Sequence, residues 1–126
     1  MRLLLDSHSL LWALFEQTRL SAPSAAAISD PTNEIFASAV SPYELEWKKA
    51  LGKLTLPNIS DWRHAFRVAG YDHVPLTVDH AQRAARLPTL HRDPWDRLIV
   101  AQAGTELMTL ITRDRKLAAY GVATLW

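Results

Sequence analysis

Short apolar runs alternate with helical segments along the chain, and this alternation restricts the fold more than any other feature of the sequence. The runs predicted to form strands are residues 2–5, 34–39, 73–77, 107–112 and 122–126. Each of the first four is followed by a segment with a helical pattern. Strands that alternate with helices predict a parallel sheet with helices on both faces. We therefore expect an α/β fold, a three-layer α/β/α sandwich with a short central parallel sheet, formed by residues 1–126 as one domain.

Start and stop signals set the predicted helix boundaries. Ser21 is a predicted N-cap with Pro23 in the first turn, and Ser41 is a predicted N-cap followed by Pro42 at the first helical position. The residues predicted to end helices are Gly52, Gly70, Pro88 and Gly104. The helices are thus predicted within residues 7–16, 20–31, 41–52, 60–70, 78–87, 92–104 and 114–120.

The composition excludes several classes of protein. Hydrophobic residues make up 48% of the chain and charged residues 21%, as in an ordinary soluble globular domain. No apolar run approaches the roughly 20 residues that cross a bilayer, and the apolar stretch after Arg2 breaks at Asp6, unlike a cleavable signal. The absence of cysteine excludes disulfides and thiolate zinc sites. We expect a cytoplasmic protein without a membrane partner, and the net charge of +1 does not by itself indicate nucleic-acid binding.

Acidic residues follow both of the most apolar strands. Asp6 comes directly after residues 2–5, and Asp114 comes shortly after the strand that ends at Thr112. In open parallel sheets, ligands bind beyond the carboxyl ends of the strands, where the strand order reverses. Glu44 and Asp96 lie in the first turns of predicted helices and can reach the same edge. We therefore expect four carboxylates from distant parts of the chain to converge on one crevice.

Converging carboxylates need protons or a cation, because like charges at about 4–6 Å raise one another's pKa. An all-oxygen ligand set favours Mg²⁺ or Mn²⁺ over softer metals. Such an ion lowers the pKa of bound water and neutralises charge in the transition state of phosphate chemistry. The chemistry predicted for the crevice is therefore metal-assisted hydrolysis of a phosphodiester.

Each acid also has a structural interpretation. Asp6 and Asp114 are placed to cap helices, and capping is the preferred interpretation of Asp93. Spacing alone favours a structural role for Glu44, which completes a capping box with Ser41 and stands four residues before Lys48. Asp96 suits the helix dipole as well as a metal, so both roles stay open.

Histidine and tryptophan have simpler interpretations. The five histidines show no paired ligand spacing and are interpreted as surface or core residues: His8, His64, His73, His80 and His91. Four tryptophans are interpreted as core or interface anchors rather than platforms for base stacking: Trp12, Trp47, Trp62 and Trp95.

Four segments together resemble the PIN-domain ribonucleases, specifically the VapC-type toxins of bacterial toxin–antitoxin pairs. They are LLLDSHSLLW, SPYELEWKKALGKLTLP, HRDPWDRLIVAQA and LITRDRKLAAYGV. The resemblance runs almost end to end and is strongest at residues 91–103 and 3–12. It implies that the metal acids are Asp6, Glu44, Asp96 and Asp114. Direct ligation is expected of Asp6 and Asp96, completion of the site of Asp114, and ligation through water or orientation of the nucleophile of Glu44.

The resemblance also implies an activity and partners. We expect an Mg²⁺- or Mn²⁺-dependent endoribonuclease that acts on RNA, forms a homodimer and assembles into a toxin–antitoxin hetero-oligomer. The C-terminal segment of a cognate antitoxin is expected to cover the active site, with an arginine entering the acid cluster. Residues expected to support the acids are Ser7, Thr112 and Asp93. Candidates for RNA phosphate contacts are Lys48, Arg97 and Arg113.

The sequence departs from the VapC pattern around the second acid. Pro42 and Tyr43 precede Glu44, and Glu46 follows two residues later. Glu46 lies about 200° around a helix from Glu44 and cannot readily replace it.

Two rival interpretations are a phosphoacceptor receiver module and a PIN-like binding module with a broken site. The receiver needs an aspartate after its middle strand and a lysine after its last strand, and neither is present; a broken site would lack acids that this chain has.

Overall fold

The computed structural model describes all residues from 1 to 126 and contains a five-stranded sheet. The strands pair in the order β3-β2-β1-β4-β5, and every pair is parallel. This confirms the predicted parallel sheet, with the proline-limited third strand at an edge. The strand bounds are β1 (Arg2–Leu5), β2 (Glu34–Ser38), β3 (Asp72–Val74), β4 (Thr109–Ile111) and β5 (Thr124–Leu125).

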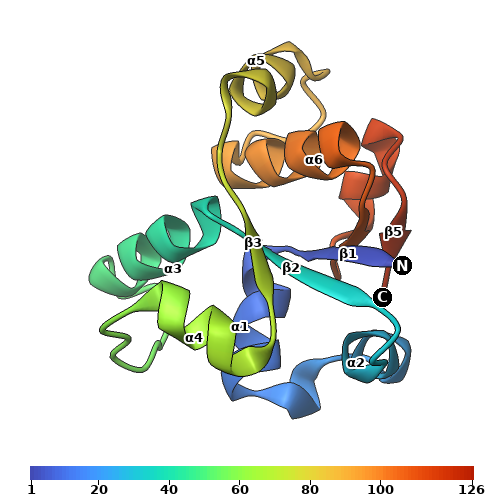
Figure 1. Cartoon of the computed structure of the whole chain (residues 1–126). Coiled ribbons are helices and arrows are strands. Elements are labelled where there is room, and N and C mark those ends of the chain that lie inside the picture. The colour runs from blue at the N-terminus through green and yellow to red at the C-terminus, as the bar shows by residue number, and fades with distance from the viewer.

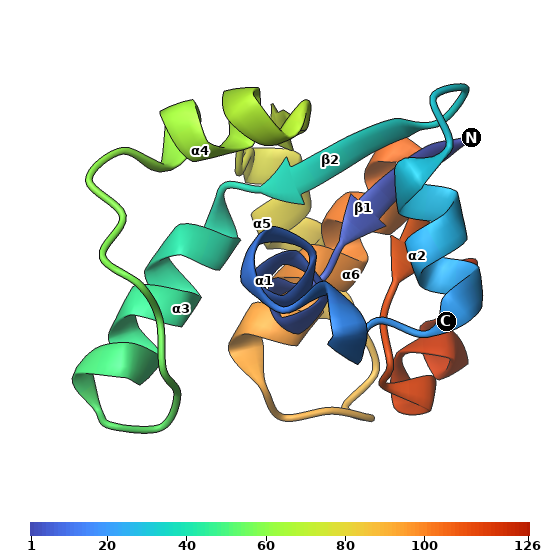
Figure 2. The same cartoon turned by 90° about the horizontal axis from the view of Figure 1, so that it is seen from below.

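Helices cover both faces of the sheet, as the prediction of a three-layer sandwich required (Figure 1). Viewed from below, α1 lies in front of β1 and β2, with α3 and α2 to its two sides (Figure 2). None of the helices has the length and apolar character needed to span a membrane. The α-helices are α1 (Ser7–Phe15), α2 (Ala22–Ser29), α3 (Val40–Ala50), α4 (Trp62–Ala69), α5 (Val78–Arg86) and α6 (Pro94–Glu106), and the 3₁₀ helices are η1 (Gln17–Arg19) and η2 (Arg115–Tyr120).

The central strand β1 separates two hydrophobic cores. Leu3 and Leu5 pack into the core that contains residues of α1 and α4, whereas Leu4 packs into the core that contains residues of α6. Successive side chains of a strand point to opposite faces of its sheet. All three leucines are fully buried, which is why an unbroken apolar run fits this position.

The start of α3 differs from the prediction. The helix begins at Val40, one residue before Ser41, so the predicted cap and its capping box with Glu44 are wrong. The backbone N–H of Val40 donates instead to the hydroxyl of Ser38, at 3.0 Å. Pro42 still falls within the first turn, where its missing N–H breaks no helical hydrogen bond.

The end of α6 also differs from the prediction. The helix continues past Gly104 to Glu106, and Leu107 takes the left-handed conformation with φ of 55°. A Cβ atom at position 104 would collide with the guanidinium of Arg83 from α5. The end of the Arg83 side chain thus occupies the space beside Gly104, and the glycine does not end the helix.

Candidate active site

The strand order places a switch point beside Asp6. The chain runs from β1 to β2 and β3 on one side, whereas β4 and β5 lie on the other side of β1. Asp6 follows β1, and its backbone N–H donates to the carbonyl of Ile111 at the end of β4, at 3.1 Å. Asp114 follows β4 at the same edge. The carboxyl ends of β1 and β4 thus bring the first and fourth acids together.

An open cleft of about 980 Å³ lies at this edge of the sheet. Asp6, Asp96 and Asp114 line it, so three of the four predicted acids meet in one cavity. A second part of its wall carries positive charge, because the guanidinium groups of Arg19 and Arg113 lie over the ring of Trp12 at 6.0 and 5.4 Å.

Helix capping holds several of these acids in place. Asp6 accepts a hydrogen bond from the N–H of Ser9 at 2.8 Å, and Asp114 accepts one from Lys116 at 2.9 Å. Asp93 caps α6 through the N–H groups of Trp95 and Asp96, which confirms the interpretation preferred for Asp93. Because a carboxylate accepts several hydrogen bonds, capping leaves lone pairs of Asp6 and Asp114 available to a ligand.

Asp96 has the most perturbed carboxyl of the cleft. It lies in the first turn of α6, and its pKa is raised from 3.8 to about 7, with burial as the largest cause. The nearby negative charges of Asp93, Glu44 and Asp6 contribute to this rise, and His91 opposes it in part. These influences show that Asp6 at the start of α1, Glu44 of α3 and Asp96 of α6 lie close enough to interact.

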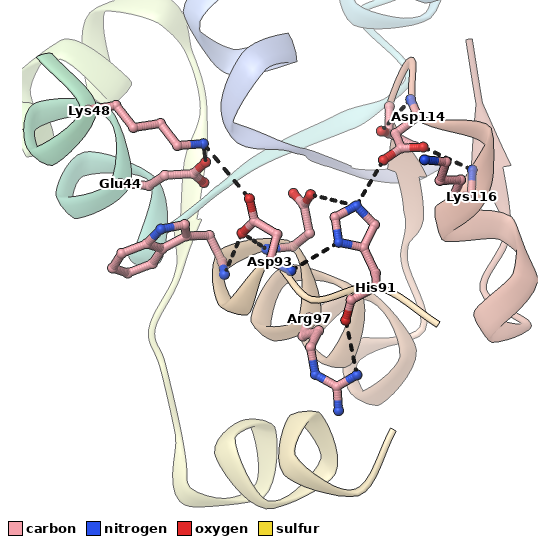
Figure 3. Close-up of polar contacts among 10 residues, drawn as sticks. Glu44, Lys48, His91, Asp93, Arg97, Asp114 and Lys116 are labelled. Carbon is pink, nitrogen blue, oxygen red and sulfur yellow. Dashed lines mark hydrogen bonds and ion pairs between the residues drawn. The ribbon is translucent and has the colours of Figure 1, made fainter. Parts of the chain in front are cut away.

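Glu44 is buried behind this cleft and paired with a lysine. Its side chain is only 2% exposed, and Lys48, one turn along α3, donates to its Oε2 atom. Burial alone would lower the pKa of Lys48, but the hydrogen bond to Glu44 and the charges of Glu44, Asp93 and Asp96 outweigh it and raise that pKa. The other oxygen of Glu44, Oε1, is buried without a hydrogen-bond partner. Glu44 therefore retains an unsatisfied acceptor beside the acids (Figure 3).

Two buried hydroxyl groups make hydrogen bonds beside the predicted metal acids Asp6 and Asp114. The hydroxyl of Ser7 lies 2.9 Å from that of Ser41, which ties the start of α1 to the start of α3. The hydroxyl of Thr112 accepts from the N–H of Asp114 at 3.0 Å. Both contacts fix the backbone next to a predicted metal acid.

His91 is a member of this site that the sequence interpretation missed. Its Nε2 atom lies 3.5 Å from Asp96 and 3.2 Å from Asp114 (Figure 3). One ligand atom from each of these three residues lies within 4.8 Å of the others, a grouping compact enough to hold a metal ion. The one sequence signal for His91 was its position two residues before the Asp93 cap. No second histidine stands at a ligand spacing from His91, so the sequence did not indicate a site there.

The three cations predicted to contact RNA phosphates have different surroundings. Lys48 is engaged by Glu44, and its Nζ lies 4.0 Å from Asp93. The guanidinium of Arg97 donates to backbone carbonyls in the segment before α6, so we do not retain Arg97 as a phosphate contact. Arg113 is exposed at the wall of the cleft and forms no ion pair with an acidic side chain. Of the three, Arg113 alone presents a free charge to the cleft.

Comparison with known proteins identifies the class of this molecule. The PIN domain model matches residues 3–123, and the chain belongs to the PIN-domain family. It is 34% identical to Ribonuclease VapC22 of Mycobacterium tuberculosis over 123 residues, which span 93% of this chain and 90% of that relative. This membership removes the receiver module from consideration.

Solved structures share the same fold. VapBC2 from Rickettsia felis, bound to a DNA fragment from its promoter, matches with a TM-score of 0.70 and 14% identity over 99% of this chain and 98% of that chain. A toxin–antitoxin complex from Klebsiella pneumoniae matches with a TM-score of 0.62 and 20% identity, over 98% and 95% of the two chains. At these identities the two matches bear on the fold alone.

Proposed function

We propose that this chain is the toxin of a toxin–antitoxin pair and acts as a divalent-metal-dependent endoribonuclease. The observation that carries the proposal is the convergence of Asp6, Asp96 and Asp114 on one cleft at the switch point, with Glu44 buried beside them. Membership in the PIN-domain family and the similarity to a protein named Ribonuclease VapC22 support RNA as the substrate.

The residues of the cleft fit an Mg²⁺ or Mn²⁺ ion. The Asp96 carboxyl has a pKa of about 7, and Glu44 Oε1 has no hydrogen-bond partner, so the site holds uncompensated acceptors. Carboxylate oxygens are the ligands that these hard cations prefer. Asp6 and Asp96 would ligate the ion directly, Asp114 would complete the site, and Glu44 would act through water. When bound, the ion would activate a water molecule and stabilise charge on the phosphate.

The remaining side chains position the acids and the substrate. Lys48 holds the carboxylate of Glu44 in its buried position. The hydroxyl of Thr112 fixes the backbone at Asp114, and that of Ser7 links α1 to α3. Arg113 is the candidate for an RNA phosphate contact, because its guanidinium is unpaired and lies in the same cleft as the acids.

The proposal includes partners. A cognate antitoxin would inhibit by placing a C-terminal arginine among the acids, since a guanidinium forms charge-assisted hydrogen bonds with carboxylates. A toxin of this kind would act in the cytoplasm as a homodimer and lose activity in the toxin–antitoxin hetero-oligomer. Two similar structures are those of VapBC2 and of a toxin–antitoxin complex, which supports this assignment.

The test is cleavage of total bacterial RNA by the purified chain with Mn²⁺ or Mg²⁺, compared with a sample in EDTA. We expect ion-dependent cleavage that falls at least about 100-fold in Asp6→Asn and Asp96→Asn, because each removes a carboxylate that holds the ion. Asp72→Asn is the matched control, since Asp72 is an exposed acid at the start of the edge strand β3. Adding the purified antitoxin should suppress cleavage.

Two outcomes would contradict the proposal. Cleavage that survives EDTA would reject the dependence on a metal. Equal cleavage by the native chain, Asp6→Asn and Asp96→Asn would reject the acid cleft as the active site. A DNA oligonucleotide of matched sequence measures the preference for RNA over DNA.

A further inference from the structure

His91 stands between two of the proposed metal acids. Its Nε2 atom faces the Oδ2 atoms of both Asp96 and Asp114, at 3.5 and 3.2 Å. A histidine beside two carboxylates is ordinarily interpreted as a third metal ligand. That interpretation requires a free lone pair on Nε2, because a metal binds an imidazole nitrogen that carries no proton.

The hydrogen bond at the other ring nitrogen determines where the proton lies. The backbone N–H of Asp93 donates to Nδ1 of His91 at 3.1 Å, so Nδ1 is the acceptor. In a neutral imidazole one nitrogen accepts and the other carries the hydrogen. Nε2 of His91 therefore carries a proton directed at Asp114 and Asp96, and has no lone pair for a metal.

The geometry points to His91 as a positioning residue that occupies the place of the ion: its Nε2–H donates to Asp114 and faces Asp96, and a divalent ion must displace it to bind. The inference rests on the proposed function, because it concerns the same acid cleft. An N–H group between two carboxylates supplies part of the compensation that a cation supplies. It lets the two acids remain close together in the absence of the ion.

The segment that carries His91 is anchored from α6. Arg97 donates to the carbonyls of Ala84, Leu87 and Pro88 at 2.8 to 2.9 Å, and to that of His91 at 3.4 Å. The backbone near His91 is therefore held while its ring remains 19% exposed. Rotation of the side chain into the cleft opening would release both acids without unfolding the segment.

The two roles of His91 predict opposite changes in ion affinity. If the ion displaces His91, His91→Ala removes a competitor for the carboxylates. Mn²⁺ should then bind about tenfold more tightly, because the contact of the His91 ring with the carboxylates no longer has to be broken. If His91 is a ligand, the same substitution weakens binding. His91→Gln retains an N–H donor, and its affinity should lie between those of the native chain and His91→Ala.

The experiment titrates the full chain with Mn²⁺ and follows free Mn²⁺ by electron paramagnetic resonance. Spin-echo modulation then reports whether a nitrogen is bonded to the bound Mn²⁺, and we expect none in the native chain. His8→Ala is the matched control, because His8 lines the same cleft and is not paired with an acid. Circular dichroism and urea unfolding establish that each variant is folded.

Weaker or unchanged Mn²⁺ binding by folded His91→Ala would overturn the inference, as would a nitrogen coupling in the native chain that this variant loses. Either result leaves the proposed nuclease intact, because the ion still binds. If neither the native chain nor His91→Ala binds Mn²⁺, the proposed metal site and this inference both fail. Binding that Asp96→Asn does not weaken would place the ion elsewhere and overturn both as well.

Discussion

Asp96 is the residue at which burial and like charge act together most strongly. Burial, as the largest cause, and the charges of Asp93, Glu44 and Asp6 together raise its carboxyl pKa to about 7. Near neutral pH, the ion-free protein therefore carries a proton on this carboxyl part of the time. A cation that binds Asp96 must expel that proton, which links metal affinity to pH.

We expect the apparent affinity for Mn²⁺ to rise with pH and to level off above about pH 7.5. The sign follows from the protonated form, which cannot ligate: below a pKa of about 7, each pH unit lowers the affinity by roughly tenfold. Calorimetric titrations between about pH 6 and pH 8, in buffers of different ionisation enthalpy, measure both affinity and proton release. Equal affinity across this range would contradict the role of Asp96.

The candidate site was predictable where chemistry coincides with a regular structural signal. Asp6 and Asp114 follow apolar strands, and Asp96 stands three residues after a helix cap, so each could be located from sequence. His91 lies in an irregular segment, and a backbone N–H turns its ring toward the acids. Arg97 likewise follows no periodic pattern to its carbonyl partners. Contacts of this kind depend on tertiary packing, which spacing along the chain does not encode.

At the scale of elements, the segment between α5 and α6 carries His91 to the side of Asp96 and Asp114. Both helices are regular and were predicted, but the connection is held by the side chain of Arg97 rather than by secondary structure. The guanidinium presents a planar fork of donors that one lysine ammonium cannot reproduce. The residue predicted to bind RNA therefore has a structural function.

Arg97→Ala should destabilise the fold by about 2–3 kcal/mol, because it removes charge-assisted hydrogen bonds to partly buried carbonyls. Arg97→Lys should restore little of this loss. Urea unfolding in EDTA measures the free energy of unfolding. The salt dependence of RNA binding tests the hypothesis that Arg97 contacts an RNA phosphate. If Arg97→Ala lost one phosphate contact in RNA binding and kept the native free energy of unfolding, the structural role of Arg97 would be contradicted.

The same contrast between regular and irregular contacts explains why the start of α3 and the end of α6 were predicted wrongly. Gly70 ends α4 in a left-handed conformation and Asp61 caps its start, so local signals set both boundaries. At the start of α3, the Ser41 hydroxyl forms a hydrogen bond with the Ser7 hydroxyl and does not cap the helix. At Gly104, the end of the Arg83 side chain occupies the space beside the glycine. Local signals of capping and termination therefore fail where another element uses the same residue.

At the scale of the whole molecule, one helix face is unusually apolar for a surface. Tyr43, Trp47 and Leu51 succeed one another at four-residue spacing along α3 and its end, and are 61%, 49% and 49% exposed. Side chains four residues apart lie on the same side of a helix. An exposed apolar face of this kind is typical of a protein–protein contact, and it supports the predicted homodimer.

We expect the native chain to be a dimer and Trp47→Lys to be a monomer, because the substitution places a charge in the centre of this face. Light scattering coupled to size-exclusion chromatography measures the mass of each. Val78→Lys is the matched control, since Val78 is 81% exposed on α5 and lies outside the α3 face. A monomeric native chain, or a dimer that persists in Trp47→Lys, would exclude this interface.

The sheet order is the global feature that brings Asp6 after β1 and Asp114 after β4 to one edge, where Glu44 of α3 and Asp96 of α6 join them. The most direct test is anomalous diffraction from crystals soaked in Mn²⁺. We expect a manganese peak in the cleft, in contact with the carboxylates of Asp6 and Asp96 and close to Asp114. An ordered cleft without a peak, or a peak only at other sites, would contradict it.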